Sequence, residues 1–242
     1  MSLKLFGRFQ ENMHDEALGS YRAHLAKRRV GLAAKSCFDI VVSLLCIIVP
    51  LPLYIIAAAA IKLGSKGPVF YRQLRVGWHC DELNVVKFRT MCTGADKEGE
   101  ITVGSTDGRI TPVGKVLRAA NFDEFPQFLQ VLAGKMSLIG VRPEVPHYVE
   151  HYAKEDYATL LMRPGMTSPV AIKYRHESEM LACSADPERT YIQEILPAKM
   201  ALNRAYVAEF SFFNDMRILG RTFKCLFEKD EAVGEKQKIT ER

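Results

Sequence analysis

The chain has 242 residues, of which 48% are hydrophobic and 25% charged, and its formal net charge is +5. This composition excludes an intrinsically disordered chain, and six cysteines without C-x-x-C spacing indicate reduced thiols, with neither a disulfide scaffold nor a zinc site. It also excludes a polytopic membrane protein, because each membrane helix needs about 20 mostly apolar residues and one segment alone provides them.

The positive charge is concentrated around that apolar segment. Residues 21–75 carry nine basic residues and one acid, Asp39, so the rest of the chain has a slight excess of acids. Nucleic-acid-binding proteins gather basic residues over a binding face that is independent of any membrane segment. The distribution therefore indicates a membrane surface and predicts no nucleic acid partner.

In chain order, residues 1–35 form a basic N-terminal segment and residues 36–63 form the membrane segment. The uncharged residues 40–61 reach about 33 Å as a helix, which is enough to cross a bilayer. Pro50 interrupts that helix, because proline has no amide hydrogen to donate to the carbonyl of Cys46. Both flanks are basic, whereas a spanning helix places one basic flank in the cytoplasm. The segment is therefore either a kinked span or a helix that breaks at Pro50 and returns to the same face.

Two charged residues, Lys35 and Asp39, lie at the start of the membrane segment. Their spacing of four residues puts them on one face of a helix. We expect a surface pair that keeps the carboxylate out of the apolar core, or else an Asp39 that simply marks the polar boundary.

Residues 64–228 are predicted to form a mostly helical α+β domain. Two β-rich runs, residues 69–75 and 83–89, flank a turn at 77–81 and predict a small hairpin. Helical patterns separated by proline and glycine follow at residues 112–118, 123–132, 145–162 and 191–227. The last of these mixes basic and aromatic side chains, which is typical of a helix at a membrane interface or of an amphipathic helix on its own core. Residues 229–242 form a polar tail.

Two adjacent carboxylates, Asp123 and Glu124, are the most informative pair in the chain. Pro126 follows them, and since proline is tolerated in the first turn of a helix it predicts a helix start near Asp123. An anion is favoured at that end of a helix, so Asp123 would stay ionised, as a nucleophile or a magnesium ligand must. The alternative is that Asn121 and Glu124 form a capping box and Asp123 only complements the helix dipole.

Basic residues that suit phosphate oxygens lie in the loops and turns around this pair: Lys87, Arg89, Arg118, Arg142 and Arg163. Two of the arginines precede prolines, which hold them on stiff turns suited to bidentate contact with phosphate. Taken alone, each of these basic residues is typical of a side chain that is simply exposed to solvent. Together with the carboxylate pair and the membrane segment, they indicate an enzyme that handles a phosphorylated donor and a lipid at the cytosolic face.

Successive motifs of the chain resemble those of the bacterial sugar transferase family, the monotopic phosphoglycosyl transferases. They are Gly67-Pro68-Val69-Phe70-Tyr71-Arg72-Gln73, Lys87-Phe88-Arg89-Thr90-Met91, Asp123-Glu124-Phe125-Pro126-Gln127, Met136-Ser137-Leu138-Ile139-Gly140-Val141-Arg142-Pro143-Glu144 and Arg163-Pro164-Gly165-Met166-Thr167. The resemblance covers residues 35–227. It implies a re-entrant membrane helix broken at Pro50, interfacial C-terminal helices and a cytoplasmic-face catalytic domain, residues 64–228, on the bacterial inner membrane.

The resemblance also implies a reaction. A UDP-sugar would give its sugar phosphate to polyprenol phosphate, such as undecaprenyl phosphate, with release of UMP, in the first membrane step of surface glycan assembly. Asp123 would be the nucleophile that forms a covalent phospho-sugar intermediate, and Mg²⁺ would bind at Asp123 and Glu124. The residues expected to contact substrate and phosphate are Lys87, Arg89, Arg118, Arg142, Pro143, Glu144 and Arg163, all of which lie in these motifs except Arg118, which lies one turn ahead of the carboxylate pair. Membrane lipids are further expected partners, and a homodimer stays open.

Departures from the family pattern indicate a distinct subgroup. Val141 stands where the family usually has proline, so the turn that carries Arg142 is expected to be less rigid. The short N-terminal segment predicts a minimal catalytic form. Two other functions stay open: a non-enzymatic scaffold for polysaccharide assembly partners, and a bitopic phosphatase or glycosidase outside the cell.

Overall fold

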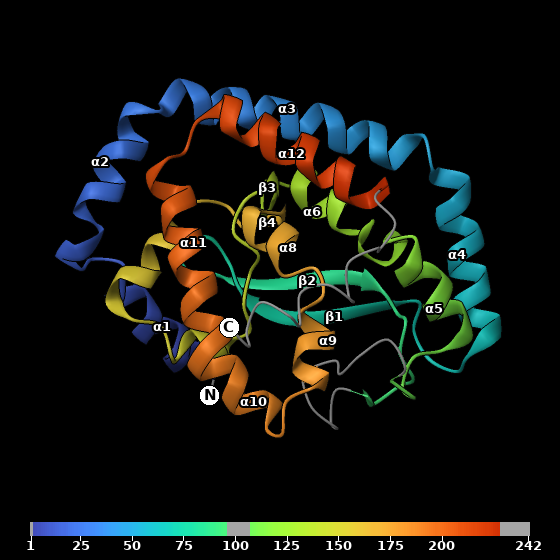
Figure 1. Ribbon diagram of the computed structural model, residues 1–242. Helices are drawn as coiled ribbons and strands as arrows, with labels where there is room; N and C mark the ends of the chain where they lie inside the picture. The colour runs from blue at the N-terminus through green and yellow to red at the C-terminus, as the bar shows by residue number, and fades with distance from the viewer. Residues whose placement is uncertain (1, 96–106, 228–242) are drawn as a thin grey trace, which may run out of the picture.

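The computed structural model describes residues 2–95 and 107–227, and it is a mostly helical α+β fold, as predicted (Figure 1). The predicted polar tail, residues 229–242, lies outside the described residues. Short 3-10 or π turns are labelled η. The helices and turns that are not discussed individually below are α1 (Ser2–Asn12), η1 (Glu16–Leu18), α2 (Gly19–Lys27), α5 (Pro112–Ala119), α8 (Pro169–Lys173), α9 (Glu177–Ala182) and α10 (Pro187–Thr190).

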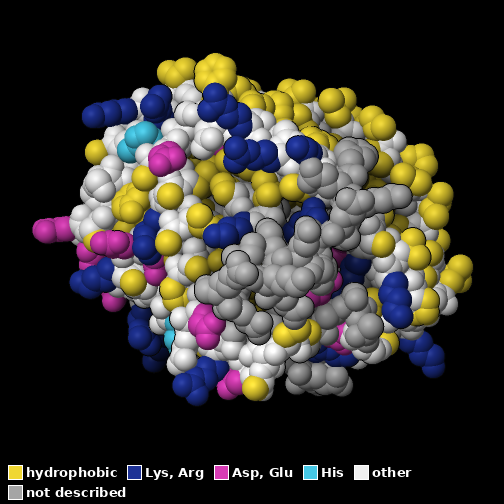
Figure 2. Space-filling view, in the orientation of Figure 1, with side chains coloured by type: hydrophobic (Ala, Val, Ile, Leu, Met, Phe, Trp, Pro, Cys, Tyr) yellow, Lys and Arg dark blue, Asp and Glu magenta, His cyan; other side chains and the backbone are white. Residues whose placement is uncertain are grey.

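An apolar frame made of α3 (Arg29–Ile48) and α4 (Leu51–Gly64) runs around one edge of the molecule (Figure 1). The chain bends between the two helices, so the predicted break at Pro50 is present. Among the described helices, α3 is the one whose length and composition would allow it to cross a membrane. Most of its large apolar side chains from Ile40 onward are exposed, as are several of α4, and hydrophobic side chains gather along this edge in Figure 2.

Tyr54 of α4 joins the break to the rest of the fold. Its hydroxyl lies 3.3 Å from the carbonyl oxygen of Cys46, which Pro50 leaves without an amide donor, and 3.0 Å from the carbonyl oxygen of Phe125. Its ring packs on Phe122, with 5.5 Å between ring centroids. A hydroxyl has one hydrogen, so the two carbonyls share one donor. The tyrosine therefore partly satisfies the broken helix and attaches it to the turn that carries Asp123.

Two small sheets complete the α+β architecture. The predicted hairpin is confirmed as β1 (Phe70–Val76) paired antiparallel with β2 (Glu82–Phe88), closed by η2 (Trp78–Cys80). The second sheet pairs β3 (Ser137–Ile139) in parallel with β4 (Gly165–Thr167). These strands approach so closely that a Cβ on Gly165 would lie 2.1 Å from the Gly140 amide nitrogen, so glycine is required there.

Two long predicted helices are each divided into shorter elements in the structure. The expected helix over residues 145–162 is wrong, because α7 (Pro146–Val149) ends early and η5 (Lys154–Leu161) starts anew where the Asp156 carboxylate accepts the Ala153 amide. The expected helix over residues 191–227 is divided into η6 (Tyr191–Ile195), α11 (Leu196–Ala208) and α12 (Phe212–Phe227). Pro197 lies in the first turn of α11.

Buried polar contacts anchor α3 to the core. Lys35 Nζ lies 2.6 Å from Asp215 Oδ2 of α12, and it also donates to the Ile139 carbonyl. Asp39 accepts hydrogen bonds from the Ser137 hydroxyl, at 2.7 Å, and the Leu138 amide. The expected surface pair of Lys35 and Asp39 is therefore wrong. Both side chains are buried and bind groups about 100 residues or more away in the chain, which a spacing of four residues does not reveal.

Candidate active site

The turn that carries the two carboxylates begins with an unusual backbone conformation. Asn121 has φ 52°, in the left-handed region, and makes no capping hydrogen bond with its side chain, so the capping-box alternative is wrong. Asp123 and Glu124 lie on η4 (Phe122–Glu124), and α6 (Gln127–Leu132) starts directly after Pro126. The helix therefore begins four residues later than predicted, and the carboxylates precede it on a tight turn.

Glu124 is held by two cations. Lys87 Nζ of β2 lies 2.6 Å from Glu124 Oε1, and the Arg142 guanidinium binds both carboxylate oxygens. Burial alone would raise the pKa of Glu124, but the charges of Arg142 and Lys87 outweigh it and hold that pKa well below the ordinary value. Glu124 is therefore ionised and fixes the positions of both cations.

Asp123 has a different environment. Among the described residues, no other side chain makes a hydrogen bond to its carboxylate. Burial, with some repulsion from Glu124, raises the pKa of Asp123, while the charges of Lys87 and Arg118 oppose the shift. The carboxylate is thus surrounded by positive charge without being hydrogen-bonded to it, which leaves its oxygens available for a bond to substrate.

Three predicted cations gather at this turn from separate elements. Lys87 comes from β2, Arg118 from α5 and Arg142 from the segment after β3. Arg118 is oriented by the hydrogen bond from its Nε to Thr90 Oγ1, at 2.8 Å. Burial lowers the pKa of Lys87, against the opposing effect of Glu124. The resulting concentration of positive charge suits the oxygens of a phosphate or diphosphate.

Pro143 and Glu144 lie next to this cluster, in a buried network of their own. The Pro143 carbonyl accepts a 2.6 Å hydrogen bond from Arg75, and Glu144 Oε1 accepts bonds from the Tyr191 hydroxyl and from Lys199 Nζ. Burial would raise the pKa of Glu144, but Lys199 and Arg75 lower it below the ordinary value. Hydrogen bonds from Arg75, Tyr191 and Lys199 thus fix the segment that follows Arg142.

Sequence reasoning missed the three residues that do this. Arg75 lies two residues after Gln73, the last residue of the first family-like motif, and this position was the available signal. Tyr191 and Lys199 are 47 and 55 residues from Glu144 and carry no local signal.

The structure does not bring Arg89 and Arg163 into the cluster around Asp123. The Arg89 guanidinium donates to the carbonyls of Ser65 and Lys66, so it holds the corner between α4 and β1. Arg163 lies against α3, with NH1 3.3 Å from the Ser36 hydroxyl and its guanidinium 5.3 Å above the Trp78 ring. Phosphate contact by these two residues stays a prediction.

The donor set at the site fits a magnesium ion that is also bound by substrate. Mg²⁺ is commonly held by one or two carboxylates together with substrate phosphates and water. Asp123 supplies a free carboxylate, whereas the oxygens of Glu124 are engaged by Lys87 and Arg142. Within residues 2–95 and 107–227, no group of three or more His, Cys, Asp and Glu side chains has metal-binding geometry. The remaining ligands would therefore come from substrate and water.

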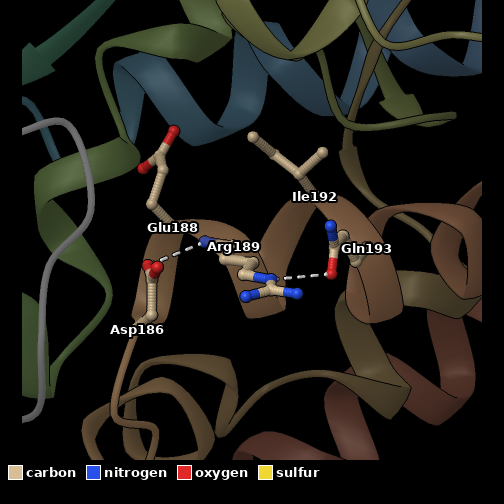
Figure 3. A pocket seen from close by; sticks show the side chains of 5 residues that line it. All are labelled: Asp186, Glu188, Arg189, Ile192 and Gln193. Carbon is tan, nitrogen blue, oxygen red and sulfur yellow. Dashed lines mark hydrogen bonds between the residues drawn. The ribbon is translucent and has the colours of Figure 1, made fainter.

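A surface hollow of about 390 Å³ lies at α10 and η6, apart from this cluster (Figure 3). Its polar side chains are already hydrogen-bonded, since Arg189 Nε donates to Gln193 Oε1, Asp186 accepts the Arg189 backbone amide and Glu188 accepts the Tyr148 hydroxyl. None of the residues that line it belongs to the cluster around Asp123. We therefore assign the candidate active site to the Asp123 turn and not to this hollow.

Comparison with known proteins gives a consistent result. Residues 30–229 match the family described as Bacterial sugar transferase. A UDP-N-acetylgalactosamine-undecaprenyl-phosphate N-acetylgalactosaminephosphotransferase of Aeromonas hydrophila is 32% identical over 93% of this chain and 50% of its own length. A UDP-glucose:undecaprenyl-phosphate glucose-1-phosphate transferase of Caulobacter vibrioides is 33% identical over 82% of this chain and 71% of its own length. The exopolysaccharide production protein PSS of Rhizobium leguminosarum bv. phaseoli is 35% identical over 78% of this chain and 92% of its own length. The chain thus spans only half of the Aeromonas relative and nearly all of the Rhizobium one.

Proposed function

Because this chain belongs to the bacterial sugar transferase family, we propose that it transfers a sugar phosphate from a UDP-sugar to undecaprenyl phosphate and releases UMP. The relatives named for this reaction use UDP-N-acetylgalactosamine or UDP-glucose as donor. The observation that carries the proposal is the Asp123 carboxylate, which is free of side-chain hydrogen bonds from the described residues and lies among Lys87, Arg118 and Arg142. The reaction would be the first membrane step of surface glycan assembly.

The proposed chemistry has two displacements at one phosphorus atom. In the first, an Asp123 carboxylate oxygen bonds to the β-phosphorus of the UDP-sugar, and the bond from that phosphorus to the oxygen of the departing UMP breaks. In the second, an oxygen of undecaprenyl phosphate attacks the same phosphorus and releases the carboxylate. A covalent intermediate allows one small site to serve two bulky substrates in turn.

The three cations share one task in this scheme, and Glu124 has another. A carboxylate that attacks the negatively charged diphosphate of the UDP-sugar meets strong repulsion, which Lys87, Arg118 and Arg142 reduce by neutralising the phosphate oxygens. Glu124 is a positioning residue, because it holds Lys87 and Arg142 on the same side of the turn as Asp123.

Mg²⁺ is proposed to bind at Asp123, with Glu124 as a second ligand only if Lys87 or Arg142 moves to the substrate. When bound, the ion would neutralise charge on the diphosphate and on the departing UMP.

We also propose that the protein is monotopic and lies at the cytoplasmic face of the bacterial inner membrane. The exposed apolar side chains of α3 and α4 support contact with lipid, and the break at Pro50 supports return of the chain to the same face. The exposed Phe213 and Phe223 of α12 support an interfacial position for that helix.

A panel of UDP-sugars tests the proposed function. Purified protein in nanodiscs with Mg²⁺ and undecaprenyl phosphate is expected to release UMP from at least one donor and to form a lipid-linked sugar diphosphate. Asp123→Asn is expected to lower the rate by 10³-fold or more, as is typical for loss of a nucleophile. Asp186→Asn, at the distant hollow, is the control and keeps the wild-type rate. A scaffold without activity would release no UMP from any donor.

A further inference from the structure

A second cavity, of about 260 Å³, lies between α3 and the turn of the β1–β2 hairpin. Its walls are the stretch of α3 from Leu32 to Asp39, the Trp78 side chain and the segment from Leu161 to Arg163. It shares no residue with the cluster around Asp123. A water molecule occupies about 30 Å³ of liquid, so the space accepts a group several times larger.

The two charged side chains of the cavity wall other than Arg163 are hydrogen-bonded within the protein, and the charges of Lys35 and Arg163 both act on the Asp39 carboxylate. Lys35 is paired with Asp215, and Asp39 is bound by the Ser137 hydroxyl and the Leu138 amide. Arg163 is different, because among the described residues its guanidinium has one hydrogen bond, a long one of 3.3 Å to Ser36. Of the two cations in the described cavity wall, Arg163 therefore has the more unused donors, since Lys35 makes two hydrogen bonds with its three N–H groups.

Trp78 leaves those donors accessible. The Arg163 guanidinium carbon lies 5.3 Å from the centroid of the indole ring, and this cation–π contact uses none of the guanidinium N–H groups as hydrogen-bond donors. The indole is fixed in turn by a 3.1 Å hydrogen bond from Nε1 to the Leu161 carbonyl. A planar guanidinium with free edge donors is suited to bidentate contact with phosphate oxygens.

The position of the cavity along α3 identifies the source of the phosphate. Ser36, whose hydroxyl contacts Arg163, lies four residues before Ile40, where the exposed apolar run begins. At 1.5 Å per residue this separation is about 6 Å, which matches the thickness of the headgroup layer on one side of a bilayer. Tryptophan is also enriched at that level.

We propose that this cavity binds the phosphate of a membrane phospholipid headgroup through Arg163. The site is distinct from the Asp123 site and would fix the depth of α3 in the bilayer. The inference rests on the proposed position of the protein at the membrane, but it does not depend on catalysis.

Trp78 is the one tryptophan of the chain, so its fluorescence reports on this cavity alone. We expect dihexanoylphosphatidylglycerol, added below its micellar concentration to protein in maltoside detergent, to change the emission in a saturable way. Dihexanoylglycerol, which lacks the phosphate, should leave the emission unchanged. Arg163→Gln should raise the lipid concentration at the midpoint of the response about tenfold or more. Arg163→Lys keeps the positive charge but cannot make a bidentate contact, so its midpoint should lie between those of the wild type and Arg163→Gln.

Arg118→Gln separates the two phosphate sites, because it should reduce UMP release and keep the wild-type fluorescence midpoint. Thermal unfolding of each variant shows that it is folded. A wild-type midpoint in Arg163→Gln, or loss of the response in Arg118→Gln, would overturn the proposal. So would inorganic phosphate that gives the same response at the same concentration, since the cavity would then take free phosphate. Failure of the proposed function appears separately, as absence of UMP release in the wild type.

Discussion

Two neighbouring carboxylates differ in what surrounds them. Glu124 is hydrogen-bonded to Lys87 and Arg142, and their charges keep its pKa well below the ordinary value. The positive charges of Lys87 and Arg118 act on Asp123, but burial raises its pKa. No side chain among the described residues is hydrogen-bonded to its carboxylate. The two carboxylates therefore have different roles: Glu124 positions the cations, and Asp123 is free to form a bond.

Removal of the Glu124 charge tests this division. In Glu124→Gln, two cations lose their shared anion. Loss of one partner of a fully buried pair costs about 3–5 kcal/mol. Lys87 and Arg142 are 21% and 36% exposed, so we expect the free energy of unfolding to fall by about 1–2 kcal/mol. Urea unfolding measures it, with Glu188→Gln in an exposed pair as the control.

The pH dependence of that stability has a defined sign. The folded pKa of Glu124 is depressed from its ordinary value of 4.5, so its contribution is present above pH 4.5 and is lost as the pH falls further. Wild type and Glu124→Gln should therefore converge in stability at low pH. A variant as stable as wild type at pH 7 would contradict the proposed role of Glu124.

At the level of elements, the break between α3 and α4 is joined to the candidate active site. Tyr54 shares its hydroxyl between the Cys46 carbonyl at the break and the Phe125 carbonyl beside the Asp123 turn. An unsatisfied carbonyl is costly where water is scarce. The hydroxyl therefore stabilises the bend and fixes the turn to it.

Tyr54→Phe isolates this contribution, because it keeps the ring among the neighbouring phenylalanines. We expect the unfolding free energy to fall by about 1 kcal/mol. The turnover rate should fall while the KM for the UDP-sugar stays near wild type, since the donor's phosphate contacts are intact. Ile55→Val, on the exposed side of the same helix, is the control. The coupling is absent if Tyr54→Phe matches wild type in both measurements.

Local signals predicted some elements and not others. The hairpin and the break at Pro50 follow from short-range patterns, a turn between β-rich runs and a proline without an amide hydrogen. Strands β3 and β4 were not predicted, because each has three residues and its partner lies in a distant part of the chain. The helix over residues 145–162 was overpredicted, since the Asp156 carboxylate starts a new turn where periodicity alone continues the helix.

The site shows the same division between local and long-range information. Asp123, Lys87, Arg118 and Arg142 could be selected from residue type and motif. The placement of Arg163 against Trp78, away from the cluster, depends on how α3 packs and has no trace in the motif itself.

Considered as a whole, the molecule has an apolar surface that extends beyond α3 and α4. Exposed apolar side chains on α5, α6 and α12 add to it: Val116, Leu129, Leu132, Phe213 and Phe223. Since α3 packs on α6 and α12, and α4 on α5, these helices lie beside the apolar frame. Such a surface suits a protein embedded in one leaflet more than one that crosses the bilayer.

Labelling of single cysteines tests the monotopic topology. Val30→Cys and Leu63→Cys place exposed thiols near the two ends of the α3–α4 frame, in a background without the native cysteines. A membrane-impermeant maleimide should label both from the cytoplasmic side of inverted vesicles and neither from the outside of intact cells with a permeable outer membrane. Labelling of the two positions from opposite sides would show that the segment spans the membrane.

The covalent step at Asp123 is the central claim, and the mass of the protein tests it most directly. Protein mixed with Mg²⁺ and the best UDP-sugar of the panel, without lipid acceptor, should gain the mass of one sugar phosphate on the peptide that contains Asp123. UMP should appear in equal amount, and undecaprenyl phosphate should then remove the added mass. Release of UMP by the wild type only in the presence of acceptor, with no adduct at any time after mixing, would contradict the account and indicate direct transfer.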